Sequence, residues 1–74
     1  MAYDYSKLRG RIAEKFKTQY AFAKKLGWSE RTLSLKLNGK IFLSQSDIEA
    51  MAEALEIERD DIQAYFFTLD AQSD

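Results

Sequence analysis

The chain has 74 residues and a mass of 8.6 kDa; 46% of its residues are hydrophobic, and its formal net charge is −1 at pH 7. This length supports one core, and this composition is that of a folded domain and excludes a chain that is disordered as a whole. The absence of cysteine and histidine excludes disulfides, the usual zinc sites and histidine-based proton transfer, so we expect no cofactor. No apolar run approaches the roughly 18 residues of a membrane span and no signal peptide is visible, so we expect a cytoplasmic protein without a membrane partner.

The first predicted helix follows Asp4, whose side chain can cap it. Its apolar residues recur at three- and four-residue spacing, which is typical of an amphipathic helix, and basic residues surround them. The apolar residues are Tyr5, Leu8, Ile12 and Phe16.

A second, short helix is predicted over residues 19–26. Thr18 can cap it, and Gly27 can end it because glycine tolerates a left-handed conformation. Its apolar stripe consists of Phe22, Ala23 and Leu26.

A third helix is predicted over residues 30–37, with Ser29 as its cap and Asn38-Gly39 as its end. The same stretch also fits a β-hairpin, because residues 32–37 alternate polar and apolar and Asn-Gly precedes an apolar run at 41–43. We favour the helix, since an isolated two-stranded hairpin is marginal in water and all other segments have helical patterns.

Two further helices complete the chain. Ser44 and Asp47 form a capping-box pattern before an apolar stripe, and a fifth helix follows Glu58. The apolar residues are Ile48, Met51, Ala52 and Leu55 in the fourth helix and Ile62, Tyr65 and Phe66 in the fifth. The prediction is an all-α, five-helix single domain over residues 1–74, with a frayed tail from about Asp70.

Charge is distributed unevenly along the chain. Residues 1–40 hold ten Lys and Arg against three acids, a net +7, whereas residues 41–74 hold one Arg against nine acids, a net −8. This asymmetry favours a first half that faces a polyanion. In the alternative, the two halves neutralise each other within the fold.

The short helix, the glycine, the serine-capped helix and Asn-Gly-Lys follow one another in the order of a helix-turn-helix. The residues that carry a family resemblance are Gln19, Phe22, Ala23, Leu26, Gly27, Leu33 and Asn38-Gly39-Lys40, followed by Ala52 and Leu55. The chain resembles the Cro and repressor helix-turn-helix family of bacteria and their temperate phages, and its two ends are similar to those of short phage Cro-like proteins. The resemblance implies a compact lambda-repressor-like fold with the helix-turn-helix in the second and third helices, double-stranded operator DNA as ligand, and homodimeric binding in a bacterial host cell.

The third helix provides candidates for reading bases. Leu33 and Leu37 lie about 40° apart on a helix and define its buried side. Such a helix enters the major groove with its N-terminal residues leading, so its outward residues are the candidates. They are Glu30, Arg31, Thr32 and Leu35. For Leu35, cover by the fourth helix or its preceding loop is the alternative.

Groups that flank this helix are candidates for binding phosphates. Gln19 lies at the start of the second helix, where free backbone donors favour anions, and the resemblance implies a DNA contact there. The other candidates are Lys36, Asn38 and Lys40. For each of the two lysines, the alternative is a solvated surface position without a phosphate contact. Tyr65, Phe66 and Phe67 are candidates for a dimer interface, with core filling as the alternative for the first two.

Two functions remain. The first is a sequence-specific transcriptional regulator, a phage Cro-like repressor acting at operator DNA in a lysis/lysogeny switch. The alternative is a modulator or antirepressor that keeps this fold but binds a partner repressor protein through the third helix, which Leu35 and the acidic second half favour. An enzyme with a small-molecule substrate has no support, because the adjacent pair Asp60-Asp61 fits a helix cap better than a catalytic site.

Overall fold

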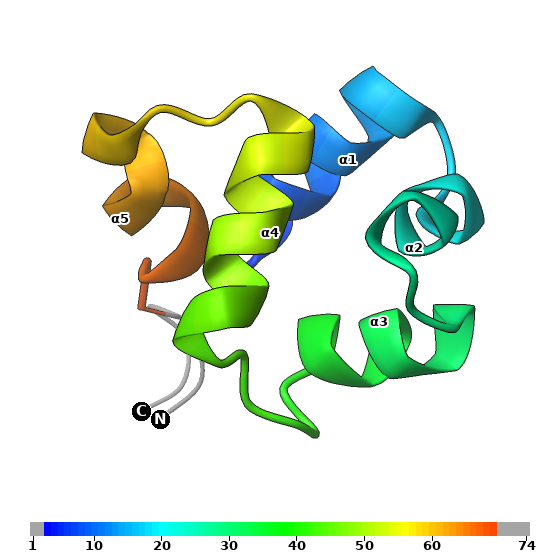
Figure 1. Ribbon diagram of the computed structural model, residues 1–74. Coiled ribbons are helices and arrows are strands. Elements are labelled where there is room, and N and C mark those ends of the chain that lie inside the picture. The colour runs from blue at the N-terminus through cyan, green and yellow to red at the C-terminus, as the bar shows by residue number, and fades with distance from the viewer. Residues whose placement is uncertain (1–2, 70–74) are drawn as a thin grey trace.

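A computed structural model describes residues 3–69, and all named elements in that range are helical (Figure 1). They are α1 (Ser6–Phe16), α2 (Gln19–Leu26), α3 (Glu30–Leu37), α4 (Gln45–Leu55), the 3-10 turn η1 (Arg59–Asp61) and α5 (Ile62–Phe66). The predicted all-α fold with five helices is confirmed. The tail predicted from Asp70 lies outside the described residues.

Local hydrogen bonds mark both ends of α1, whose N-cap residue is Tyr5 and not Asp4 as predicted. The Asp4 carboxylate accepts a hydrogen bond from the Ser6 N–H at 2.8 Å, and its hydrogen bonds with Ser6 hold the pKa of Asp4 below its ordinary value. At the other end, Lys17 has a positive φ of 72°, and the Thr18 N–H donates to the Phe16 carbonyl at 2.8 Å. This tight turn directs the chain into α2.

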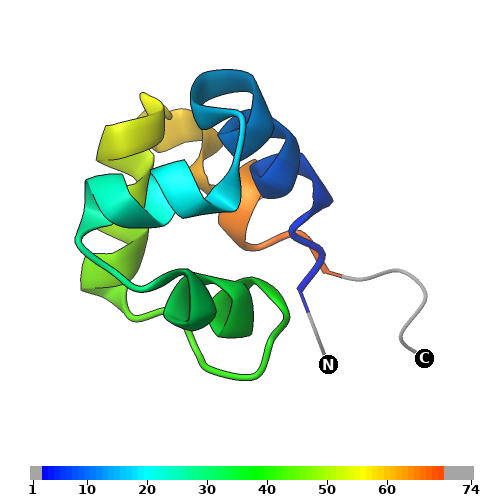
Figure 2. The same ribbon diagram turned by 90° about the vertical axis from the view of Figure 1, so that its right-hand side faces the viewer.

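The caps of α2 and α3 are those that the sequence predicts. The Thr18 hydroxyl accepts from the Ala21 N–H, and the Ser29 hydroxyl accepts from the Thr32 N–H, each at 3.1 Å. Gly27 ends α2 in the left-handed conformation at φ 79°. Figure 2 shows the short connection that results between the two helices.

α4 begins with the predicted capping box. Ser44 Oγ accepts from the Asp47 N–H at 3.1 Å, and the Ser44 N–H donates to Asp47 Oδ2 at 3.0 Å. Glu56 ends the helix in the left-handed conformation, and η1 then leads into α5, the fifth helix expected after Glu58.

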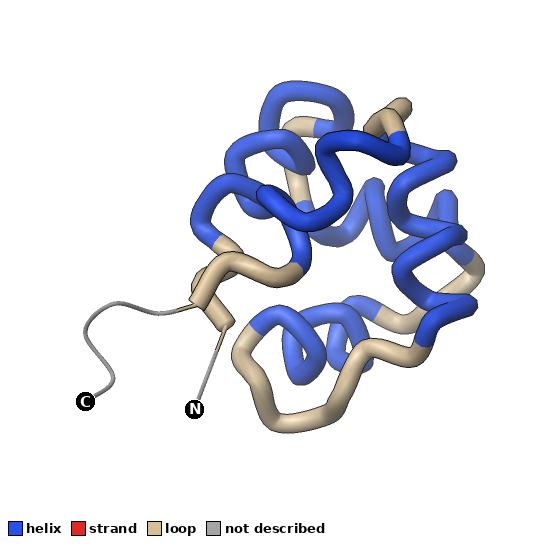
Figure 3. The backbone as a smooth tube through the Cα atoms, turned by 90° about the vertical axis from the view of Figure 1, so that its left-hand side faces the viewer, coloured by secondary structure: helices blue, strands red, loops and turns tan. Residues whose placement is uncertain are grey.

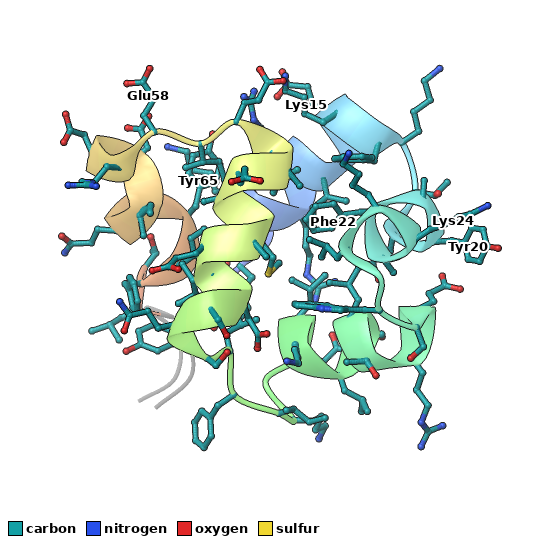
Figure 4. The ribbon with its side chains drawn as sticks, viewed as in Figure 1. Lys15, Tyr20, Phe22, Lys24, Glu58 and Tyr65 are labelled. Carbon is teal, nitrogen blue, oxygen red and sulfur yellow. The ribbon has the colours of Figure 1, made fainter. Side chains whose placement is uncertain are left out.

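The core is built from all five helices. Figure 4 shows Phe22 directed from α2 into the interior, where it is fully buried. Removing such a side chain from water stabilises the fold by about 1.5–3 kcal/mol. The buried apolar residues are Leu8, Ile12, Phe22, Ala23, Leu33, Leu37, Met51, Ala52, Leu55, Ile57 and Phe66.

The two ends of the described chain lie side by side. The Asp4 N–H donates to the Thr68 carbonyl at 2.7 Å, and Tyr3 and Leu69 form an isolated antiparallel bridge. Otherwise residues 3–69 are helices joined by loops, as Figure 3 shows, so the β-hairpin alternative for residues 32–43 is excluded. No helix in this range is long and apolar enough to cross a membrane.

Candidate interaction surface

The outward side of α3 carries the four residues that were predicted to read bases. Leu33 and Leu37 are 0% and 3% exposed and form the buried side of the helix. Of the four residues, two are exposed and two are half-buried. We call this set, Glu30, Arg31, Thr32 and Leu35, the α3 surface.

The loop between α3 and α4 runs beside Leu35. The N–H groups of Lys40 and Ile41 both donate to the Leu35 carbonyl, at 2.9 and 3.4 Å. Leu35 is half-buried. Beyond it, Ile41 is 43% exposed and Phe42 is 95% exposed. The sequence interpretation missed these two as surface residues because their apolar run resembled a hairpin strand.

Lys36 is engaged inside the fold. Its Nζ donates to Asp47 Oδ2 and lies 4.6 Å from the centre of the Trp28 ring. Burial acts to raise the pKa of Asp47, but hydrogen bonds with Lys36 and Ser44, together with the Lys36 charge, hold it below the ordinary value of 3.8. The two charged side chains are only 14% and 16% exposed. The contact leaves Lys36 poorly placed to bind a phosphate, its predicted role.

The other three phosphate candidates differ in their surroundings. Asn38 Oδ1 accepts from Arg9 Nη2 at 2.7 Å, and the same guanidinium nitrogen donates to the Leu37 carbonyl at 3.0 Å. Asn38 therefore helps Arg9 to satisfy the C-terminal end of α3. Gln19 is half-buried at the start of α2, and Lys40 is exposed in the loop. Of the four candidates, Lys36 and Asn38 thus bond to other side chains of the fold.

Much of the positive charge in the first half contacts other parts of the chain. Arg11 Nε donates to the Leu55 carbonyl at 3.0 Å, and Lys15 Nζ lies 3.2 Å from a Glu56 carboxylate oxygen. Lys7 Nζ lies 4.8 Å from the centre of the Tyr65 ring. Lys15 and Tyr65 can be found by their labels in Figure 4. With Arg9 and Lys36, five of the ten basic residues in 1–40 make such contacts. Two of these contacts, Lys15 with Glu56 and Lys36 with Asp47, are ion pairs between the two halves, and they favour the alternative in which the halves neutralise each other.

The predicted dimer residues do not share one surface. Phe66 is 1% exposed and belongs to the core, so it is not available to a second chain. Tyr65 is half-buried beside Lys7. Phe67 is 42% exposed, and its ring packs edge-on against the Tyr3 ring with 5.7 Å between the two ring centres. Core filling, the alternative offered for Tyr65 and Phe66, is the better description of both.

The described part of the chain is a compact helical domain of the helix-turn-helix type with a partly apolar third helix. The chain belongs to the family described as "Protein of unknown function (DUF739)", whose model matches residues 1–69. Among solved structures it is similar to the solution structure of the modulator of repression (MOR) of the temperate bacteriophage TP901-1 from Lactococcus lactis. The identity is 51%, the TM-score is 0.81, and the match covers 90% of each chain. No curated protein matches the chain.

These similarities correct two predictions. The assignment to the Cro and repressor family is wrong, because the matching family is DUF739 and the similar structure is a modulator of repression. The predicted function, a Cro-like repressor reading operator DNA as a homodimer, is wrong for the same reason. Caps, glycine stops and buried leucines specify how the helices are arranged, but they do not specify what the exposed side of α3 binds.

Proposed function

We propose that this protein is a phage modulator of repression that acts by binding a partner repressor protein. The observation that carries the proposal is its 51% identity to MOR over 90% of both chains. In this proposal the whole chain acts as one domain in the cytoplasm of a bacterial host, and its role is regulatory rather than enzymatic.

The proposed contact lies on the α3 surface. Leu35 offers apolar area that a protein partner can cover, while Glu30 and Arg31 provide charges at the start of the helix. Within residues 3–69, Arg31 forms no ion pair, so it is free to pair with a partner. An apolar centre with a charged rim is the usual arrangement of a protein interface.

Calorimetric titration of the purified protein into the repressor encoded in the same phage genome tests this proposal. Leu35→Ala is expected to weaken binding about tenfold, because it truncates the apolar centre of the contact, and Arg31→Ala is expected to weaken binding less, because it removes one charge of the rim. The controls are Lys24→Ala and Tyr20→Ala, which change a charged and an apolar side chain on the outer side of α2 (Figure 4). Tyr20 is 60% exposed, so its loss leaves the core intact.

The proposal requires that the two controls bind like the wild type. It is refuted if the wild type shows no heat of binding and does not co-elute with the repressor. The assignment to α3 is refuted if the α3 variants bind as tightly as the controls while the wild type binds well.

A further inference from the structure

An apolar groove lies between the start of α4 and α5, next to the α3–α4 loop. We call it the α4–α5 groove; its lining residues are Leu43, Gln45, Ile48, Glu49, Ile62 and Phe67, and its volume is roughly 430 Å³. Apolar side chains form most of this lining, and Gln45 and Glu49 are its polar members. The groove offers space for partner side chains, together with one carboxylate.

Phe42, next to the groove in the chain, is an exposed aromatic side chain. It directly precedes Leu43, which lines the groove, yet Phe42 itself is 95% exposed. The loop that carries it is held at both ends. Arg9 binds the Leu37 carbonyl and Asn38 before the loop, and the Ser44 capping box follows it. Phe42 is therefore presented on a fixed backbone, which lowers the entropic cost of binding through it.

The loop also connects the groove to the α3 surface. Its backbone lies against Leu35 through the hydrogen bonds of Lys40 and Ile41, and Ile41 is 43% exposed. Figure 1 shows this loop crossing the lower edge of the molecule from α3 to the start of α4. The loop thus contacts Leu35 at its start, and Ile41, Phe42 and the groove residue Leu43 follow one another along it.

The charge of the groove indicates what kind of partner it fits. All its lining residues come from residues 41–74, the segment with one Arg and nine acids. Glu49 is exposed and forms no ion pair within residues 3–69. A partner segment that complements the groove carries an apolar side chain to pack against its apolar lining and a Lys or Arg to pair with Glu49.

We propose that the α4–α5 groove and Phe42 form a second part of the repressor contact, which receives an apolar side chain of the repressor flanked by a basic residue. This inference rests on the proposed function and extends the interface beyond α3. Contact with the same segment of a second copy fits less well, because residues 41–74 offer Glu49 only one Arg among nine acids.

The test compares groove variants with matched controls in the same calorimetric titration against the repressor. Phe42→Ala is expected to weaken binding about tenfold, while Tyr20→Ala, another exposed aromatic truncation, leaves binding unchanged. Glu49→Gln is expected to weaken binding about threefold at low salt and to reduce its salt dependence. Glu53→Gln, an exposed carboxylate one turn further along α4, is the control for charge.

The outcomes separate this inference from the proposed function. If the wild type does not bind the repressor, both fail. If the wild type binds and Leu35→Ala weakens binding while Phe42→Ala and Glu49→Gln do not, only the groove inference is overturned. It is also overturned if sedimentation velocity shows a dimer of the free protein that Phe42→Ala dissociates, because the groove is then occupied by a second copy.

Discussion

The contact between Lys36 and Asp47 gives the most direct prediction about stability. It joins the last turn of α3 to the first turn of α4, and both side chains are mostly buried, at 14% and 16% exposed. Lys36→Met removes the charge and keeps the apolar stem, whereas Asp47→Asn removes the charge and keeps an acceptor for the Ser44 N–H. The double variant completes a thermodynamic cycle that isolates the pair.

The expected size of the effect follows from partial burial. Exposed ion pairs contribute about 0–1 kcal/mol, and breaking a fully buried pair costs about 3–5 kcal/mol. For this pair we expect each single variant to lower the free energy of unfolding by about 1–2 kcal/mol, with a coupling energy of about 1 kcal/mol. In a domain of this size, each kcal/mol corresponds to about 4–8 °C in Tm.

Urea unfolding followed by circular dichroism measures these free energies, and pH provides a second check. The pKa of Asp47 is lowered in the folded state, so its charge contributes fully above the unfolded value of about 3.9. That contribution is lost as the pH falls through the lower folded pKa, so the difference between wild type and Asp47→Asn is constant near neutral pH and disappears in strong acid. Single effects that add within about 0.3 kcal/mol would refute the coupling.

Three further predictions concern the backbone and are also measured by urea unfolding. Arg9→Met is expected to destabilise the protein by about 1–2 kcal/mol, because it leaves the Leu37 carbonyl without this donor; an unchanged stability would show that water replaces the guanidinium. Lys17→Gly is expected to raise the free energy of unfolding by about 1 kcal/mol, because Lys17 has φ 72° in a tight turn and glycine adopts positive φ without strain. The control Lys24→Gly lies inside α2 and is expected to lower the free energy of unfolding by about the same amount. Gly39→Ala is expected to lower the free energy of unfolding by about 1 kcal/mol. The cause is the φ of 78° alone, since an added methyl group meets no atom within 4 Å. An unchanged free energy of unfolding would contradict that backbone conformation.

The helices could be predicted from sequence because their caps are local. Thr18, Ser29 and Ser44 each bond to a backbone N–H three residues further on, and Gly27 needs only its own conformation. The arginines of α1 could not be predicted in the same way. Arg9 and Arg11 reach carbonyls 28 and 44 residues away, so their role appears only after the chain has folded.

The candidate site was predicted only in part for a related reason. Helical periodicity identified the buried side of α3 correctly, since Leu33 and Leu37 are buried and Arg31 is exposed. Periodicity does not show that Lys36 bonds to Asp47 or that Phe42 remains exposed, because both depend on how α4 packs against α3. The basic first half therefore suggested DNA, although half of its basic side chains contact other parts of the chain.

In the proposed function this protein acts through a repressor and does not read DNA. The most direct test follows the fluorescence anisotropy of labelled operator DNA with the repressor of the same phage, with this protein alone, and with both. The protein alone is expected to leave the anisotropy unchanged. Together with the repressor it is expected to shift the repressor titration in proportion to its concentration, and Leu35→Ala is expected to remove this shift. Salt-sensitive, operator-specific binding by the protein alone, lost in Arg31→Ala and indifferent to the repressor, would contradict the account.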